Sequence, residues 1–124
     1  MEENTILTSQ EVMEHIVRAL DSKKARDITV LKTDKVSVLA EYFVICTAGS
    51  PAQIKSLSDE TGKRLSELDE APRRVEGYRA GGWVLMDYHT VIVHVFTRDA
   101  RQFYNLDKLW SEAEEVDIAP LLIE

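Results

Sequence analysis

The first feature that could carry chemistry is the Gly49-Ser50 pair, which stands between a strongly apolar run and a segment with helical periodicity. A Gly-Ser turn at the N-terminus of a helix can hold a phosphate group, because free backbone N–H groups and the helix dipole both favour an anion there. Nucleotidyl transfer also needs paired carboxylates on a following strand to hold metal ions. The turn therefore raises one enzymatic hypothesis, which depends on finding that pair.

The acidic residues that follow the turn do not form such a pair. Four of them fall within the expected helix or at its end: Asp59, Glu60, Asp69 and Glu70. Asp87 lies in a strand-like run, but neither residue two positions away is acidic. We therefore expect no catalytic residues and interpret Ser50 as a helix N-cap. A nucleotide-binding or nucleotidyltransferase enzyme that uses Gly49-Ser50 is the alternative.

Nucleophilic and metal chemistry have less support still. The single cysteine, Cys46, lies in the most apolar run, where a thiol usually behaves as a small hydrophobic group. The histidines are scattered and have no Cys or His partner at metal-ligand spacing. We therefore expect neither a metal nor a cofactor. His94 is a candidate for a binding face instead, because a polar residue on an apolar face often has a defined partner.

The segment 83–97 is typical of a β-hairpin, since it contains two strand-like runs joined by a very short turn. Strand alternation places Trp83 and Asp87 on one face of the first strand and Tyr88 on the other. In the second strand, the residues that share a face are Ile92, His94 and Phe96. One face must pack on helices, and the other carries Trp83 or Tyr88, both typical interface anchors. The hairpin is therefore the main candidate for a partner-binding surface.

These residues must be positioned by a chain that is expected to run helix, two strands, helix, connection, two strands, helix. The expected elements are a helix opened by the capping box Thr8-x-x-Glu11, strands at 27–31 and 42–47, a helix capped by Ser50, a polar connection at 73–82, the hairpin, and a last helix through Phe103 and Tyr104. The run 42–47 is nearly all apolar, which is typical of a central strand covered on both faces. The strand that follows the second helix is expected to lie parallel to the strand at 42–47. The sequence thus predicts one α/β domain, a mixed β-sheet flanked by helices.

Composition narrows the classes of function. The 124 residues make one domain, and the net charge of −7 disfavours nucleic acid, whose binding depends on neutralising phosphates. A basic cluster that includes Arg73, Arg74 and Arg79 leaves RNA binding as a second alternative. A basic protein surface is the better match for an acidic chain. One cysteine, no signal peptide and no apolar run of about 20 residues together predict a cytoplasmic protein.

A series of segments around the hairpin forms a specific signature. It comprises Glu76-Gly77-Tyr78, Trp83 to Tyr88, Val91 to Phe96, Phe103 to Leu106 and Leu109-Trp110, preceded by Ala25 to Leu31, Glu41 to Thr47 and Gln53. This series resembles the ribosomal silencing factor family, also called Iojap-like, and covers about 9–110 of the chain. The sequence departs from the family at the hairpin turn, where His89-Thr90 replaces the usual Gly-Asp, and at Glu41, where Asp is usual.

The resemblance implies a fold related to the nucleotidyltransferases but without their catalytic carboxylates, in a protein that is not an enzyme. It implies binding to large-subunit ribosomal protein fourteen, a basic protein at the subunit interface. Binding there stops the small subunit from joining the large one and represses translation under nutrient limitation. A homodimer in the free state is also implied. Apolar groups near the C-terminus that exceed what one small core covers agree with it: Leu106, Leu109, Trp110, Leu121, Leu122 and Ile123.

We therefore expect residues 1–110 to form the ribosomal silencing factor domain and residues 111–124 to form an acidic C-terminal tail. The expected partner-binding residues are Glu76, Trp83, Asp87, Tyr88, His94, Phe96 and Tyr104. The aromatic groups would supply desolvated contact area, and the carboxylates would meet basic residues of the partner. Tyr88 can join this surface only through the turn or the sheet edge.

Overall fold

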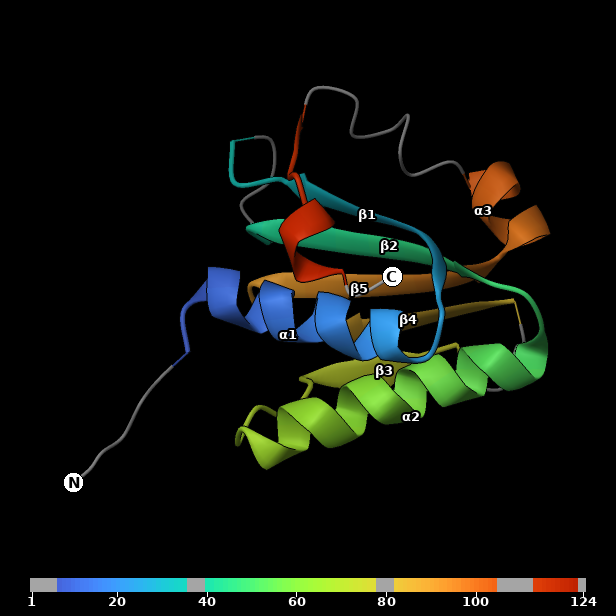
Figure 1. Cartoon of the computed structure of the whole chain (residues 1–124), viewed down its shortest axis with the longest axis horizontal. Helices are drawn as coiled ribbons and strands as arrows, with labels where there is room; N and C mark the ends of the chain where they lie inside the picture. The colour runs from blue at the N-terminus through green and yellow to red at the C-terminus, as the bar shows by residue number, and fades with distance from the viewer. Residues whose placement is uncertain (1–6, 36–39, 78–81, 105–112, 123–124) are drawn as a thin grey trace.

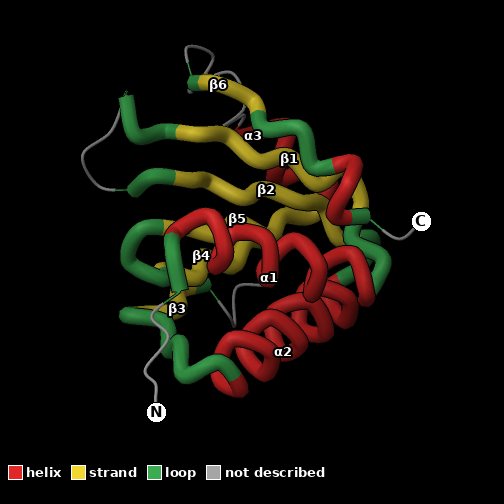
Figure 2. Tube along the Cα trace, turned by 60° about the vertical axis from the view of Figure 1, so that its left-hand side comes forward, coloured by secondary structure: helices red, strands yellow, loops and turns green. Residues whose placement is uncertain are grey.

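The computed structural model describes residues 7–35, 40–77, 82–104 and 113–122. Its strands are β1 (Arg26–Lys32), β2 (Tyr42–Ala48), β3 (Arg74–Glu76), β4 (Trp83–Asp87), β5 (Val91–Thr97) and β6 (Glu114–Glu115). Its helices are α1 (Ser9–Ser22), α2 (Pro51–Glu67) and α3 (Arg98–Tyr104), with a short 3-10 helix, η1 (Ala119–Leu121). The strands form one sheet in the order β3-β4-β5-β2-β1-β6, which Figures 1 and 2 show with its helices. The predicted α/β domain with a mixed sheet is confirmed.

The central strand of the sheet is β2, as its apolar sequence predicted. All seven of its residues are buried. It pairs with β5 in parallel and with β1 in antiparallel orientation. Such a strand has no solvent-facing side, which explains why its sequence shows no polar alternation.

The hairpin is also confirmed, but its relation to β2 is not the expected one. Strands β4 and β5 pair with Trp83 opposite Phe96 and Leu85 opposite His94. The parallel partner of β2 is β5, whereas β4, the strand that the sequence predicted to follow the second helix, runs antiparallel to β2, so the expected parallel orientation is wrong for that strand. The cause is an additional strand: the connection predicted at 73–82 contains β3, which pairs with β4. All three residues of β3 are exposed, so no pattern of apolar residues marked it in the sequence.

The two faces of the sheet are covered by different elements. Helices α1 and α2 lie side by side on one face (Figures 1 and 2), where side chains such as Ile16 and Leu57 join a core with Val44 and Val93. Ala100 of α3 packs against a second cluster, on the opposite face. The chain therefore leaves β2 toward one face, through α2, and leaves β5 toward the other, through α3.

The predicted helix caps are present. Thr8 and Glu11 form the reciprocal capping box of α1. The Ser50 hydroxyl accepts the N–H of Gln53 at 3.1 Å. A reciprocal capping box would also have the Gln53 side chain accept the N–H of Ser50, but it accepts the N–H of Gly49 instead. The Gln53 amide also donates to the carbonyls of Lys23 and Lys24, at 3.1 Å each. It thereby joins the start of α2 to the end of α1.

The C-terminal segment expected as an acidic tail takes part in the fold. Strand β6 pairs with β1, and Glu115 lies opposite Leu31. Ile118 is buried in the core beside α1 and α2. Leu121 and Leu122 are partly buried against that core, so they no longer support a dimer. The other apolar groups cited for it lie outside the described residues: Leu106, Leu109, Trp110 and Ile123.

Within the described ranges, none of the helices combines the length and the apolar character that crossing a membrane requires.

Gly62 in α2 provides a test of the helix packing. A Cβ built at this position has no atom within 4 Å, so no close contact requires the glycine. We expect Gly62→Ala to raise the free energy of unfolding by about 0.5–1 kcal/mol, because alanine favours the helix and restricts the unfolded chain. Urea unfolding followed by circular dichroism measures the change.

Gly77→Ala is the matched control and should have the opposite effect. Gly77 has a φ of 82°, and a Cβ there would lie 2.1 Å from the carbonyl oxygen of Trp83. Loss of stability in Gly62→Ala would show that α2 is packed more tightly than this structure indicates.

Candidate functional site

Four rings gather on the sheet face opposite α1 and α2, and we call Phe43, Trp83, His94 and Phe96 the aromatic cluster. The centroid of the His94 ring lies 5.2 Å from that of Phe43, 5.8 Å from Trp83 and 5.9 Å from Phe96. The Trp83 and Phe96 rings are stacked at 5.1 Å. Contacts of this kind stabilise aromatic pairs beyond the area that they bury. Three adjacent strands thus hold one packed group of rings.

A hydrogen bond within the cluster fixes the state of His94. The Trp83 indole N–H donates to Nδ1 of His94 at 3.1 Å. Nδ1 must therefore lack a proton, so the neutral ring carries its proton on Nε2. Burial lowers the pKa of His94 to about 4. Nε2 is buried and has no hydrogen-bond partner among the described residues.

The members of the cluster differ in exposure. His94 and Phe96 are 4% and 0% exposed, while Trp83 is only half-buried. Trp83 is therefore the ring that reaches solvent, and it packs against the buried rings of His94 and Phe96. Sequence alternation placed His94 and Phe96 on one face of their strand, and the expected contact surface grouped them with Trp83; the structure brings these three rings together.

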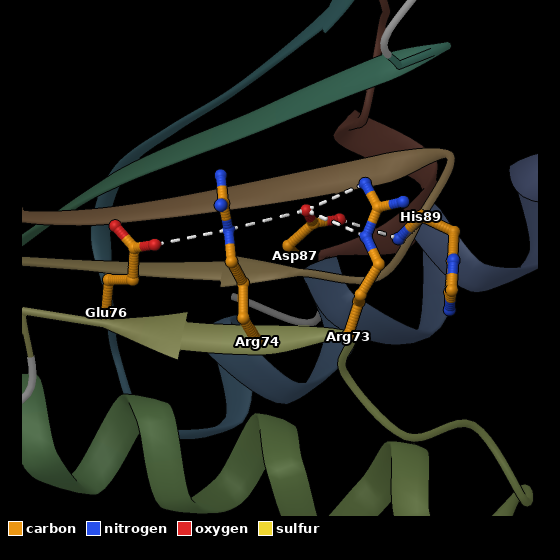
Figure 3. Close-up of polar contacts among 5 residues, drawn as sticks. All are labelled: Arg73, Arg74, Glu76, Asp87 and His89. Atoms are coloured by element: carbon orange, nitrogen blue, oxygen red, sulfur yellow. Dashed lines mark hydrogen bonds and ion pairs between the residues drawn. The ribbon is translucent and has the colours of Figure 1, made fainter.

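Asp87 binds groups of its own chain on three sides (Figure 3). Its Oδ1 accepts the backbone N–H of His89 at 2.9 Å, and its Oδ2 accepts Nη2 of Arg73 at 3.0 Å. Nε of Arg74 lies 3.8 Å from Oδ2 and 3.2 Å from Oε2 of Glu76. The Asp87 carboxylate is thus a structural group that joins β3, β4 and the hairpin turn.

This turn has an unusual backbone at the point where the sequence departs from its family resemblance. His89 has a φ of 73°, in the left-handed region that favours glycine. The Asp87 carboxylate stabilises this conformation by accepting the N–H of His89.

The ion pairs also bear on RNA binding. Arg73 and Arg74 both contact the Asp87 carboxylate, and Arg74 contacts Glu76 as well. Their charge is therefore partly neutralised within the chain. Arg79, the third arginine of the basic cluster, lies outside the described residues.

The structure does not bring Tyr88 to the aromatic cluster. Tyr88 is 3% exposed and belongs to the core beneath α1 and α2, on the other face of the sheet. Burial raises its pKa to about 12. Tyr104 is the last residue of α3, and the position of its side chain is outside the described structure.

The Gly49-Ser50 turn uses its polar groups internally. The N–H of Gly49 donates to Gln53 Oε1 at 2.5 Å, and the Ser50 hydroxyl accepts the N–H of Gln53. A phosphate at this turn would have to displace Gln53. No group of three or more His, Cys, Asp or Glu side chains in the described part of the chain is arranged to hold a metal ion. Cys46 is fully buried, and burial raises its pKa to about 12.

Two residues of the site were missed by sequence reasoning. Phe43 lies in a strand in which every residue is apolar or buried, so no pattern assigned it to a face. Arg73 is brought to Asp87 by the pairing of β3 with β4, which the sequence did not indicate.

Comparison with known proteins identifies the family. The family model described as "Ribosomal silencing factor during starvation" matches residues 6–123. The chain belongs to this family. A ribosomal silencing factor of Halalkalibacterium halodurans is 38% identical over 112 residues, which are 90% of this chain and 96% of that protein. The chloroplastic protein Iojap of Zea mays is 29% identical over 83% of this chain and 45% of its own length.

Solved structures of related proteins share this fold. A crystal structure from Chromobacterium violaceum aligns with a TM-score of 0.83 at 31% identity, covering 85% of this chain and 88% of that one. A second, from Bacillus halodurans, has a TM-score of 0.78 at 37% identity and covers 87% and 98%. The mixed α/β fold is therefore the fold of the family. The family model also extends through the segment expected as a tail.

Replacement of Asp87 by asparagine tests its structural role. Burial by itself raises the pKa of Asp87, but the His89 N–H and the Arg73 guanidinium together lower it by more, so the pKa of this carboxyl lies below its ordinary value. A carboxylate with a depressed folded-state pKa stabilises the protein above its unfolded pKa and loses that effect as the pH falls through the folded value. We expect Asp87→Asn to lower the free energy of unfolding by about 1–3 kcal/mol at pH 7. The difference from the wild type should shrink below about pH 4.

The control for Asp87 is Asp59→Asn, which breaks an exposed ion pair with Lys55 on the surface of α2. Such a pair contributes about 0.5 kcal/mol or less. Urea unfolding between pH 3 and pH 7 gives both values. An Asp87→Asn protein as stable as the control would mean that β3 and the turn do not depend on this carboxylate.

The protonation state of His94 gives a second pH prediction. Its folded-state pKa of about 4 lies below the ordinary value of 6.5. Between these values the unfolded chain binds a proton that the folded chain does not, so this group makes stability fall as the pH falls from 6.5 toward 4. In ¹⁵N NMR we expect the His94 ring to remain neutral, with its proton on Nε2, from pH 7.5 to pH 5. A titration midpoint near pH 6.5 would contradict this.

Proposed function

We propose that this protein silences ribosomes by binding large-subunit ribosomal protein fourteen and preventing the small subunit from joining the large one. Translation would thereby be repressed when nutrients are limiting. The observation that carries the proposal is the family match over residues 6–123, together with relatives that are named ribosomal silencing factors. The protein would act in the cytoplasm, and a homodimer would be its free form.

The aromatic cluster supports a protein-binding role. Trp83 is half-buried and rests on the buried rings of His94 and Phe96. Its indole N–H is held by His94. A tryptophan fixed in this way loses little side-chain entropy on binding, which is why such residues are common anchors of interfaces. We therefore propose Trp83 as the centre of the contact, with His94 and Phe96 as its support.

The neighbouring edge of the sheet extends this surface. Strand β3 pairs with β4, and Glu76 lies opposite Leu85, which puts its side chain on the same face of the sheet as Trp83. The side chain of Glu76 forms an ion pair with Arg74 but remains 57% exposed, so it can also meet basic residues of a partner. The chain's net charge of −7 fits a basic partner, since complementary charge raises the rate of association. Asp87 would contribute by holding Arg73 and the turn, and not by direct contact.

We propose that this action needs no catalysis. The groups of the Gly49-Ser50 turn are engaged in capping α2, and a protein that acts by occupying a surface requires only binding. Incubation with ATP or GTP and magnesium should therefore yield no product above that of a protein-free control.

The decisive variant for the proposed function is Trp83→Ala. We expect its affinity for the isolated ribosomal protein to fall more than tenfold, because truncation of an anchor of this kind costs about 2 kcal/mol or more. Its ability to lower the fraction of joined ribosomes should fall in parallel. Calorimetry measures the first effect, and light scattering of mixed subunits measures the second.

Charge reversals provide the matched controls. Glu76→Lys should slow association with the ribosomal protein and weaken its salt dependence. Glu67→Lys makes the same charge change at an exposed position on α2, away from the cluster, and should have a smaller effect. Circular dichroism must show that all variants fold. If Trp83→Ala binds and silences like the wild type, the aromatic cluster is not the contact surface.

A further inference from the structure

A cavity of about 750 Å³ opens at the end of the sheet where β2 and β5 both terminate. It is lined by the last residues of β2, the start of β1, Gly49 and the first turn of α3. In Figure 1 this is the end of the sheet at which the chain turns from β2 into α2 and from β5 into α3. A cavity of this volume is in the range of sites for small molecules.

The position of the cavity follows from the topology. Strands β2 and β5 are adjacent and parallel, so their carboxyl ends lie at the same edge. The connection after β2 leads to α2 on one face, and the connection after β5 leads to α3 on the other. Connections that diverge in this way open a crevice outside the strand ends, which is where α/β proteins bind ligands.

The charges in the cavity favour an anion. Arg26, Arg98 and Arg101 line it, against the two carboxylates Asp27 and Asp99. The cavity is therefore net positive in a chain whose net charge is −7. Arg26 and Arg98 are exposed, and neither has an ion pair with any other described residue.

Arg101 has a different role, because it holds the wall of the cavity. Its guanidinium donates to Thr47 Oγ1 and Thr29 Oγ1, at 3.0 Å each, and to the carbonyl of Asp27. These bonds attach α3 to β1 and β2. They fix the first turn of α3, which carries Arg98 and Asp99, against the ends of the strands.

We propose that this cavity binds a free phosphorylated ligand of nucleotide size. Arg26 and Arg98 bind the phosphate oxygens, since a guanidinium matches a phosphate in shape and charge. Asp27 and Asp99 accept hydrogen bonds from hydroxyl or amino groups of the ligand. The amide of Gly49 takes no part, because Gln53 occupies it. Binding therefore rests on side-chain cations and requires neither magnesium nor turnover.

This inference goes beyond the silencing function and concerns a different part of the molecule. The cavity lies at the carboxyl ends of β2 and β5, whereas the proposed contact surface centres on Trp83 at the start of β4 and on the edge strand β3. Loss of one site by mutation should therefore leave the other intact, which separates the two proposals.

The test is calorimetric titration of the full chain with ATP, GTP, pyrophosphate and adenosine, each in the presence of EDTA. We expect saturable binding of at least one nucleotide and weaker or no binding of adenosine, which lacks phosphate. Arg26→Ala and Arg98→Ala should each weaken nucleotide binding about tenfold, since each removes a charged hydrogen-bond donor. Arg18→Ala, which makes the same change at an exposed position of α1, should leave it unchanged.

Several outcomes would overturn the proposal. They are no saturable binding of ATP, GTP or pyrophosphate up to millimolar concentration, equal binding of adenosine and ATP, or equal affinity in the folded Arg26, Arg98 and Arg18 variants. Binding that appears only with magnesium and is accompanied by product formation would assign the cavity to catalysis. Tighter binding of a single-stranded RNA oligonucleotide than of ATP would assign it to RNA.

Discussion

The parallel pairing of β2 with β5 is the constraint on which the rest of the structure depends. Because β2 is buried along its whole length, both faces of the sheet must be covered around it. Helices α1 and α2 cover one face, while α3 packs on the other through Ala100. The same pairing brings the ends of both strands to one edge, where the cavity opens.

Away from this centre, the fold depends on polar contacts at the sheet edge. Strand β3 has no buried residue, so apolar packing of its own side chains does not hold it in place. The Asp87 carboxylate supplies the missing contacts, since it binds Arg73, lies near Arg74 and fixes the turn at His89. A residue expected to meet a partner therefore acts first within the chain. It positions the strand that carries Glu76, on the sheet face where the half-buried ring of Trp83 lies.

The aromatic cluster joins stability to the proposed binding. Its buried members fix the orientation of Trp83, and the hydrogen bond from the indole N–H selects one tautomer of His94. The consequence is a buried Nε2 without a partner among the described residues, which is an unfavourable state for a polar group. The unpaired Nε2 lowers the stability of the fold, while the cluster holds one aromatic ring rigidly at the surface. This is the arrangement expected of a contact surface that must be formed before its partner arrives.

The sequence by itself determined what depends on local patterns. The capping residues Thr8 and Ser50, the apolar run of β2 and the alternation in the hairpin each act over a few neighbouring positions, and each was predicted correctly. A large part of the family signature lies in β2 and the hairpin, so the sequence alone also indicated the family.

The tertiary structure alone decided which residues are exposed and which contacts form between distant segments. Sequence alternation assigned His94 and Phe96 to one face of their strand, but burial depends on what covers that face. Strand β3, the pairing of β6 with β1 and the ion pairs of Asp87 are contacts between segments with little apolar pattern. The cavity arises where three strand ends and a helix meet, although Arg26 and Arg98 are far apart in the chain. Such features depend on how the elements pack in space, and the local periodicity of the sequence does not indicate that packing.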